Sequence, residues 1–292
     1  MSSDIAPWGV GPFMTVDVES TSKYAEEARV VEIYTGFVHQ KDDGGYGIRG
    51  AVGLINPGVE IPQEAIDVHG ITNERVQAEG KPPPEILEIA FQNIEVALSQ
   101  YGASLVIMNA PYDLTVLDRD AERNGMKSLS ERLGGTIRPV LDPLVIDSHC
   151  IKYRKRVSEK QGARQLKTLC QAHGISWVDK MAHGAEYDAL QAVRVIYRLA
   201  QQAAMGGWIL RKNGYSPRDV SMFMRLASLE PGQIHDLQID WYREKSENYR
   251  NYLLKEAASQ DDEAKANELK EKAAVVRFEW PIVCKSKKET LF

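Results

Sequence analysis

The sequence lacks the features that mark membrane-spanning, secreted and disulfide-stabilised proteins. Its 292 residues contain no run of about 18 apolar residues, so no transmembrane helix is expected. The first residues have no basic segment ahead of an apolar one, so no secretory signal is predicted. The three cysteines form no CxxC pair and indicate free thiols in a reducing compartment; they are Cys150, Cys170 and Cys284. We therefore expect a cytoplasmic protein with no membrane partner.

The sequence also lacks an excess of positive charge. It has 36 Lys and Arg against 41 Asp and Glu, a net charge of −5, which argues against a protein that coats duplex DNA by bulk electrostatics. One segment departs from this balance, because residues 150–167 carry several basic side chains against Glu159 alone. The basic residues are Lys152, Arg154, Lys155, Arg156, Lys160, Arg164 and Lys167. The segment is either a stripe that faces phosphate groups or a solvated surface, and both interpretations stay open.

Hydrophobic residues make up 43% of the chain and charged residues 26%, as in a soluble globular protein with room for one or two domains. Short β-branched and aromatic segments predict strands, and apolar residues at helical spacing predict helices. The expected strands are 12–18, 28–40, 46–57, 103–109 and 138–147. The expected helices are two short turns around Gly70 within 61–76, then 83–102, 111–125, 164–174 and 183–203. This order predicts an α/β domain over residues 10–205.

Residues 206–292 have a different character and are expected to form a helical C-terminal extension. Helices are predicted over 216–229 and 235–258, both with polar faces. A charged segment that follows is expected to be a mobile link, and the apolar residues 276–283 are expected to dock back on the domain. The sequence indicates no role for this extension.

Four acidic residues occupy positions that the predicted elements make meaningful. Asp17 and Glu19 end the first strand and leave the extended chain on the same face. Asp113 follows the strand at 103–109, and Asp188 lies in the first turns of a helix. Ligands of α/β sheets gather at strand ends, so we expect these four carboxylates to converge.

Carboxylates that converge repel one another and need a compensating charge. Divalent cations bound by oxygen ligands supply it, and two such ions can activate water and stabilise the leaving oxygen in phosphodiester hydrolysis. His183 lies five residues before Asp188 and is expected close to the ions without binding them. Histidine titrates near neutral pH, which suits a residue that takes a proton from the attacking water.

Three segments of the sequence resemble the motifs of the DnaQ-like 3′→5′ exonucleases, the histidine-bearing branch of the DEDD superfamily. They are VDVEST (16–21), NAPYD (109–113) and HGAEYDA (183–189), and VHGIT (68–72) resembles a further signature of that family. The resemblance covers about residues 12–200. The tyrosine branch has a Tyr four residues before the last Asp, where this chain has Gly184. The family often has a histidine where this chain has Met108.

The resemblance implies a ribonuclease H-like fold, a mixed sheet with flanking helices. It implies Asp17, Glu19, Asp113 and Asp188 as ligands of two divalent cations, Mg²⁺ or Mn²⁺, and His183 as the general base. It further implies that the terminal nucleotide is held by Ser20, Thr21, His69, Asn109 and Tyr112.

The activity that the resemblance implies is removal of nucleotides from the 3′ end of a nucleic acid, with single-stranded DNA as the first candidate. Proofreading beside a polymerase partner would then take place in trans. Two alternatives stay open: an RNA-trimming enzyme of the same fold, and a non-catalytic scaffold that recruits partners. The motifs do not show a contact to the 2′-hydroxyl, which distinguishes RNA from DNA.

Overall fold

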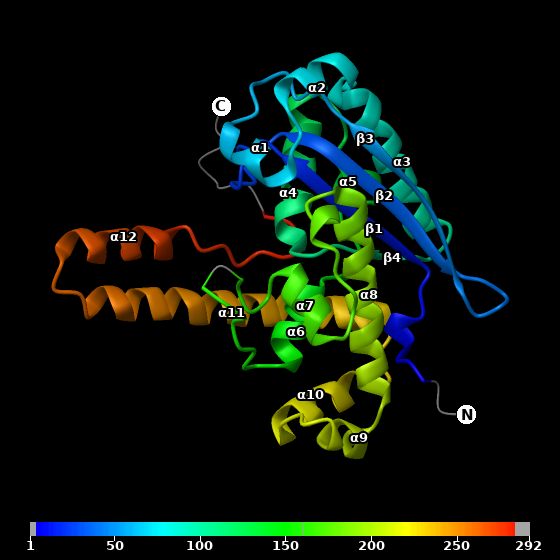
Figure 1. Ribbon diagram of the computed structural model, residues 1–292, viewed down its shortest axis with the longest axis vertical. Coiled ribbons are helices and arrows are strands. Elements are labelled where there is room, and N and C mark those ends of the chain that lie inside the picture. Colours follow the sequence, from blue (N-terminus) through cyan, green and yellow to red (C-terminus); the bar gives the residue numbers. More distant parts are fainter. Residues whose placement is uncertain (1–3, 160, 284–292) are drawn as a thin grey trace.

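The computed structural model describes residues 4–159 and 161–283, and the strands in these residues form one mixed sheet (Figure 1). The strands are β1 (Phe13–Ser20), β2 (Val30–Gln40), β3 (Tyr46–Leu54), β4 (Ser104–Val106) and β5 (Val140–Leu141). Their spatial order is β3-β2-β1-β4-β5, with β1 at the centre. β1 pairs antiparallel with β2 and parallel with β4, and β5 continues the parallel half. The carboxyl ends of β1, β4 and β5 therefore meet at one edge of the sheet.

Helices precede, separate and follow the strands. In the first part of the chain they are α1 (Gln63–His69), α2 (Asn73–Glu79), α3 (Pro83–Ser99), α4 (Ala110–Arg123), α5 (Leu129–Arg132), α6 (Pro143–Cys150), α7 (Leu166–Ala172) and α8 (Ala185–Ala204). The C-terminal helices are α9 (Gly207–Lys212), α10 (Pro217–Leu226), α11 (Pro231–Ala258) and α12 (Glu263–Ala274). Two 3₁₀ helices, η1 (Pro7–Gly9) and η2 (Asp179–Met181), complete the set that the described residues form.

Helices cover both faces of the sheet. On one face, Val16 and Val18 of β1 pack into a hydrophobic cluster with the apolar faces of α3 and α4. On the other face, Phe13 of β1 packs with α6, α7, α8 and α10. The two clusters follow from the alternation of side chains along a strand. Thr15, Asp17 and Glu19 thus share the face that α8 covers.

Side chains of α11 complete the outer edge of the sheet at β5. Gln238, which is fully buried, accepts a hydrogen bond from the backbone N–H of Asp142 at 2.8 Å and donates to the carbonyl of Val140 at 2.8 Å. His235 accepts from the N–H of Val140 at 3.0 Å. These side chains occupy the hydrogen-bonding groups that an edge strand otherwise leaves open. The extension therefore packs on the sheet, and its division from the domain near residue 205 stays a prediction.

The segment at 276–283 docks on the domain as expected. The N–H of Val283 donates to Thr115 Oγ1 on α4 at 3.0 Å, and Arg119 Nη2 donates to the carbonyl of Val283 at 3.0 Å. Trp280 and Val283 are both buried. The two turns around Gly70 are also confirmed, since α1 ends at that glycine, whose φ is +73°.

Two expectations about secondary structure were wrong. The strand expected over 138–147 stops at Leu141, because the carboxylate of Asp142 accepts a hydrogen bond from the N–H of Leu144 and Pro143 occupies the first turn of α6. The charged segment expected as a mobile link forms α12, which folds back along α11 (Figure 1). Asp262 caps α12 by accepting from two backbone N–H groups, and Ala266 and Ala273 are buried.

Within the described residues no helix is long and apolar enough to cross a membrane. Cys150 and Cys170 are buried free thiols, as the sequence predicts, and Cys284 lies outside the described residues. Burial raises the pKa of the Cys170 thiol to about 12. Neither described cysteine is therefore suited to act as a nucleophile at neutral pH.

The contacts of Gln238 generate a stability prediction. Gln238→Leu removes both hydrogen bonds and leaves two buried backbone groups without partners, each at a cost of about 1–3 kcal/mol. We expect the free energy of unfolding, measured by urea denaturation, to fall by about 2–4 kcal/mol. Gln77→Leu, an exposed position on α2, is the matched control and should change it by less than about 0.5 kcal/mol. Equal stability of the two variants would show that α11 does not support β5.

Candidate active site

Three elements bring the four predicted carboxylates together at the carboxyl edge of the sheet. Asp17 and Glu19 lie near the end of β1, and Asp113 lies in the first turn of α4. The N–H of Val18 donates to Asp113 Oδ1 at 3.1 Å, which fixes the start of α4 against β1. Asp188 lies in the first turn of α8, and its Oδ1 is buried without a hydrogen-bond partner in the described residues.

Thr15 and Asp142 position the helices that carry these acids. Thr15 Oγ1 lies 2.9 Å from the carbonyl of Val106 on β4 and 3.0 Å from that of Ala189 on α8. The carboxylate of Asp142 accepts hydrogen bonds from the N–H groups of Asn109 and Ala110 at 3.1 and 3.0 Å. The contacts of Thr15 join α8 to the sheet, and those of Asp142 join the start of α4 to the end of β5.

The electrostatic cost of this arrangement appears in the pKa of every member. Burial raises the pKa of Asp17 well above its ordinary value, and the neighbours that raise it further are all carboxylates. Burial raises the pKa of Glu19 to about 8, with added repulsion from Asp188. Burial raises the pKa of Asp113 to about 8, against the hydrogen bond from Val18 that lowers it. The pKa of Asp188 is also raised by burial.

This donor set fits divalent cations. It consists of buried and half-buried carboxylates, it carries an orphaned oxygen on Asp188, and its repulsion would be relieved by positive charge. As they stand, no three His, Cys, Asp or Glu side chains of the described residues converge closely enough to hold an ion.

His183 and Asn109 share an unusual backbone conformation beside these acids. Both have φ of +61°, and in the described residues only these two side-chain-bearing residues have positive φ. The N–H of His183 donates to Asp188 Oδ2 at 3.3 Å, so the loop before α8 is tied to the last acid. The imidazole of His183 belongs to an exposed residue. Strained backbone of this kind is concentrated at functional sites, which supports the sequence-based interpretation of both residues.

Four of the five predicted nucleotide contacts line one hollow of about 610 Å³ next to Glu19. They are Ser20, Thr21, His69 and Tyr112; Asn109 lies outside it. The hydroxyls of Ser20 and Tyr112 are hydrogen-bonded to one another. The hydroxyl of Thr21 accepts from the N–H of Arg29 at 3.0 Å and is largely buried, so it has a structural partner already.

The imidazole of His69 belongs to a residue that lines this hollow. Its Nδ1 accepts from the N–H of Ile71 at 3.0 Å, whereas its buried Nε2 has no hydrogen-bond partner in the described residues. Burial lowers the pKa of His69, so the ring is neutral at neutral pH. The VHGIT segment thus builds part of the hollow with α1.

Sequence reasoning missed Glu32, a fifth carboxylate beside the site. It lies on β2 directly opposite Glu19 in the strand register and is buried. Burial raises its pKa, and an Arg75 guanidinium 4.0 Å away opposes that rise. The β1–β2 register could have revealed Glu32, but the connection from Thr21 to Arg29 is no tight hairpin turn and does not fix a register.

Residues 14–196, more than half of the chain, match the sequence profile of a protein family described as exonucleases. The chain belongs to the DnaQ-like 3′→5′ exonuclease family. The resemblance inferred from the motifs is thereby confirmed, and the exonuclease is a phosphodiester hydrolase. Its family uses divalent metal ions.

Individual relatives agree with this assignment. Ribonuclease T of Hahella chejuensis (strain KCTC 2396) is 24% identical over 210 residues, which are 70% of this chain and 90% of that protein. Exonuclease I from Methylocaldum szegediense has a TM-score of 0.50 at 17% identity, over 72% of this chain and 42% of its own. A zinc-bound complex of E. coli Exonuclease I with single-stranded DNA has a TM-score of 0.50 at 15% identity, over 70% and 46%.

The exonuclease spans less than half the length of these two solved proteins. Likeness at such low identity concerns the fold alone, and it confirms the expected ribonuclease H-like fold. The roles of the individual site residues stay predictions.

The raised pKa values generate a prediction about stability in the absence of metal. Ordinary Asp and Glu side chains titrate near pH 4 in the unfolded chain, whereas the pKa of Glu19 and of Asp113 is about 8 in the folded protein. The folded state therefore holds protons that the unfolded state has lost. We expect the free energy of unfolding in EDTA, measured by urea denaturation, to fall as the pH rises from about 5 to about 8.

Asp113→Asn removes the charge of one of these acids and keeps the size and shape of the side chain. At pH 8 in EDTA we expect this variant to be more stable than the wild type by at least about 1 kcal/mol. Asp67→Asn, an exposed acid on α1, is the control and should keep the wild-type dependence on pH. A wild-type stability that does not change over this pH range would contradict the buried charge cluster.

Proposed function

We propose that the protein is a metal-dependent 3′→5′ exonuclease that removes nucleotides from the 3′ ends of single-stranded DNA. The observation that carries the proposal is the quartet of acids from β1, α4 and α8, adjacent to the hollow lined by Ser20 and Tyr112; Asp113 is buried and the other three are half-buried. Asp17, Glu19, Asp113 and Asp188 would hold two divalent cations, Mg²⁺ or Mn²⁺.

The bound cations would activate the attacking water and stabilise the charge of the leaving oxygen. Side chains of the protein would transfer the proton and bind the terminal nucleotide. His183 takes a proton from the attacking water, since its loop ends beside Asp188. The hollow beside Glu19 holds the terminal nucleotide, where the neutral ring of His69 and the hydroxyls of Ser20 and Tyr112 offer polar contacts.

RNA is the second candidate polymer. The likeness to a protein named Ribonuclease T favours it, because that relative is matched over 90% of its own length. DNA is the first candidate that the motif resemblance implies; the Exonuclease I solved with single-stranded DNA shares the fold at lower identity and coverage and does not select a polymer. Recruitment to a polymerase for proofreading in trans stays a prediction.

The polymer is decided by digestion of 5′-labelled substrates side by side. Single-stranded DNA, duplex DNA, DNA with a mismatched 3′ end and single-stranded RNA are compared with Mg²⁺ and with Mn²⁺. The proposal is supported if single-stranded DNA is shortened from its 3′ end with the highest kcat/KM of the four substrates. A preference for RNA would replace DNA with the second candidate, and no hydrolysis of any substrate would overturn the proposed function.

Loss of one metal ligand should stop hydrolysis without unfolding the protein. We expect Asp17→Ala to lower kcat by at least about 10³-fold, because each factor of ten corresponds to about 1.4 kcal/mol of transition-state stabilisation. Asp67→Ala removes an exposed acid on α1 and should leave the rate unchanged. Wild-type turnover by a purified, folded Asp17→Ala variant would reject the assignment of this ligand.

Loss of the general base should lower the rate of hydrolysis. We expect His183→Ala to lower the single-turnover rate by about 10²–10⁴-fold at saturating Mn²⁺. The loss should appear throughout this measurement, because the variant has no side chain at this position that can take the proton. A variant within about threefold of wild type between pH 5.5 and 9 would leave His183 as a structural residue.

A further inference from the structure

A second hollow, separate from the one beside Glu19, lies between α6, the segment that follows it, α10 and α11. Its volume is about 370 Å³, and four cations line it against one carboxylate, Glu244. The cations are Lys152, Arg164, Arg218 and Lys245. We call it the basic hollow. In a chain with a net charge of −5, such a concentration of positive charge creates a local potential that attracts anions.

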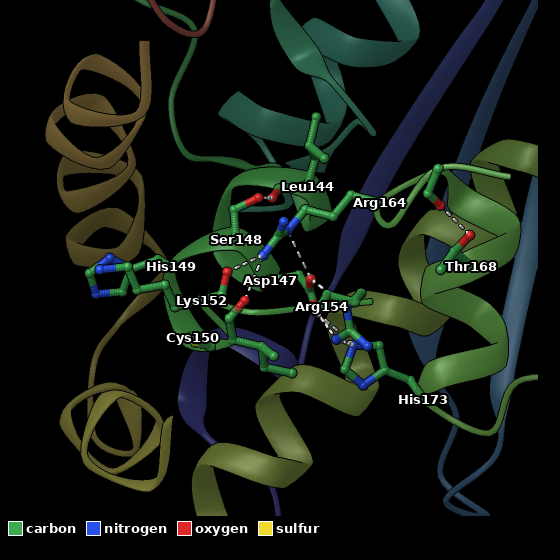
Figure 2. Close-up of polar contacts among 12 residues, drawn as sticks. Leu144, Asp147, Ser148, His149, Cys150, Lys152, Arg154, Arg164, Thr168 and His173 are labelled. Carbon is green, nitrogen blue, oxygen red and sulfur yellow. Dashed lines mark hydrogen bonds and ion pairs between the residues drawn. The ribbon is translucent and has the colours of Figure 1, made fainter. Parts of the chain in front are cut away.

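A buried carboxylate holds the basic segment in place. Asp147 of α6 is fully buried and forms ion pairs with Arg154 and, at 3.5 Å, with Arg164; His173 of α7 lies 3.0 Å from it. Figure 2 shows both guanidinium groups directed at this acid. Arg164 also donates to the carbonyl of Ile151 at 2.6 Å. The segment is therefore an anchored loop and not a freely solvated one.

Some of the basic side chains around the hollow are held in ion pairs, and others are not. Lys167 pairs with Asp179 at 2.6 Å, and Arg218 pairs with Asp219 at 3.1 Å. The side chains of Lys152 and Lys245 form no ion pair or hydrogen bond within the described residues. These two ammonium groups line the hollow and are free to meet an anion.

Aromatic side chains accompany the free cations. Tyr153 is 83% exposed, and Lys152 Nζ lies 5.5 Å from the centre of its ring. Inside the hollow, His149 and Trp241 stack with ring centres 3.8 Å apart. The pKa of His149 is lowered to about 4 by burial and by nearby arginines. Cations interleaved with exposed aromatic rings are typical of surfaces that bind single-stranded nucleic acid.

The basic hollow is connected to the active site by α6. That helix is capped by Asp142, which accepts a hydrogen bond from the backbone N–H of Asn109, and it ends at Cys150 next to the basic segment. Eight residues of α-helix span about 12 Å, a distance that a few nucleotides of an extended strand cover. We propose that Lys152, Lys245 and Tyr153 bind the single strand a few nucleotides upstream of its 3′ end, through phosphates and one stacked base. This inference rests on the proposed function and extends it to a second contact with the same substrate.

Equilibrium binding tests the proposal without hydrolysis. The probe is a 5′-fluorescein-labelled 20-nucleotide oligothymidylate, with the ribonucleotide oligomer in parallel, in EDTA. For Lys152→Ala with Lys245→Ala we expect a dissociation constant raised about tenfold or more, and a slope of log K against log salt reduced by about 1.4, at about 0.7 per single-strand phosphate contact. Tyr153→Ala should raise the dissociation constant by about 5- to 100-fold.

Matched variants separate the site from general effects of charge. Lys255→Ala with Lys270→Ala removes two exposed lysines of α11 and α12, and Tyr252→Ala removes an exposed tyrosine of α11; all should bind as wild type. Lys152→Arg with Lys245→Arg should restore the salt slope. Hydrolysis of a dinucleotide, which does not reach the hollow, should stay within about twofold of wild type in the alanine variants.

Several outcomes overturn the proposal. One is a wild-type dissociation constant and salt slope in the double alanine variant. Another is a loss of dinucleotide hydrolysis in the alanine variants that is as large as their loss of oligonucleotide binding, which would place the defect at the reaction centre. A third outcome has two parts: the wild-type protein binds polyglutamate as tightly as the oligothymidylate, and Tyr153→Ala does not change the dissociation constant of the oligothymidylate. The hollow would then be a general polyanion site. A wild-type protein that hydrolyses no substrate contradicts the proposed function instead, and the binding measurement still decides the second contact.

Discussion

The mutual repulsion of the carboxylates at the carboxyl edge of the sheet is the constraint on which the rest of the structure depends. Water screens these acids poorly, so each raises the pKa of the next. Such a cluster relaxes apart unless the backbone around it is fixed. The parallel pairing of β1 with β4, the Thr15 contacts to α8 and the Asp142 contacts to α4 provide that rigidity. A proton or a cation must then neutralise the site, which connects the affinity for metal to pH.

Much of this site could be predicted from the sequence because its residues occupy short, local patterns. The spacing of Asp17 and Glu19 sets one strand face, and their order relative to Asp113 and Asp188 follows from the alternation of strands and helices. The resemblance of the motifs to a family supplied the roles. The strand over 28–40 and the helix over 183–203 were predicted almost to the residue, because both have long and regular apolar periodicity.

Features that depend on pairing across the fold could not be predicted. Glu32 becomes part of the site only through the register of β2 on β1, and the basic segment is fixed by an acid on a neighbouring helix. The strand at 138–147 was overextended because a buried strand and a buried helix both have apolar residues, and one capping residue, Asp142, decides where one becomes the other. Likewise, the high charge of α12 concealed the alanines that it packs on α11.

The side-chain amide of Gln238 makes the two edge strands of the sheet, β5 and β3, differ in how open they are to a further strand. At β5 the backbone groups of Val140 and Asp142 are already occupied by side chains of α11, so no further strand can pair there without displacing that helix. At the opposite end, β3 pairs on one side alone, with β2, among the strands that residues 4–159 and 161–283 form, and its Ile48 and Val52 are each 48% exposed. Growth of this sheet by strand addition, whether by a peptide or a second copy of the chain, is therefore confined to β3, on the far side of β2 from the catalytic edge.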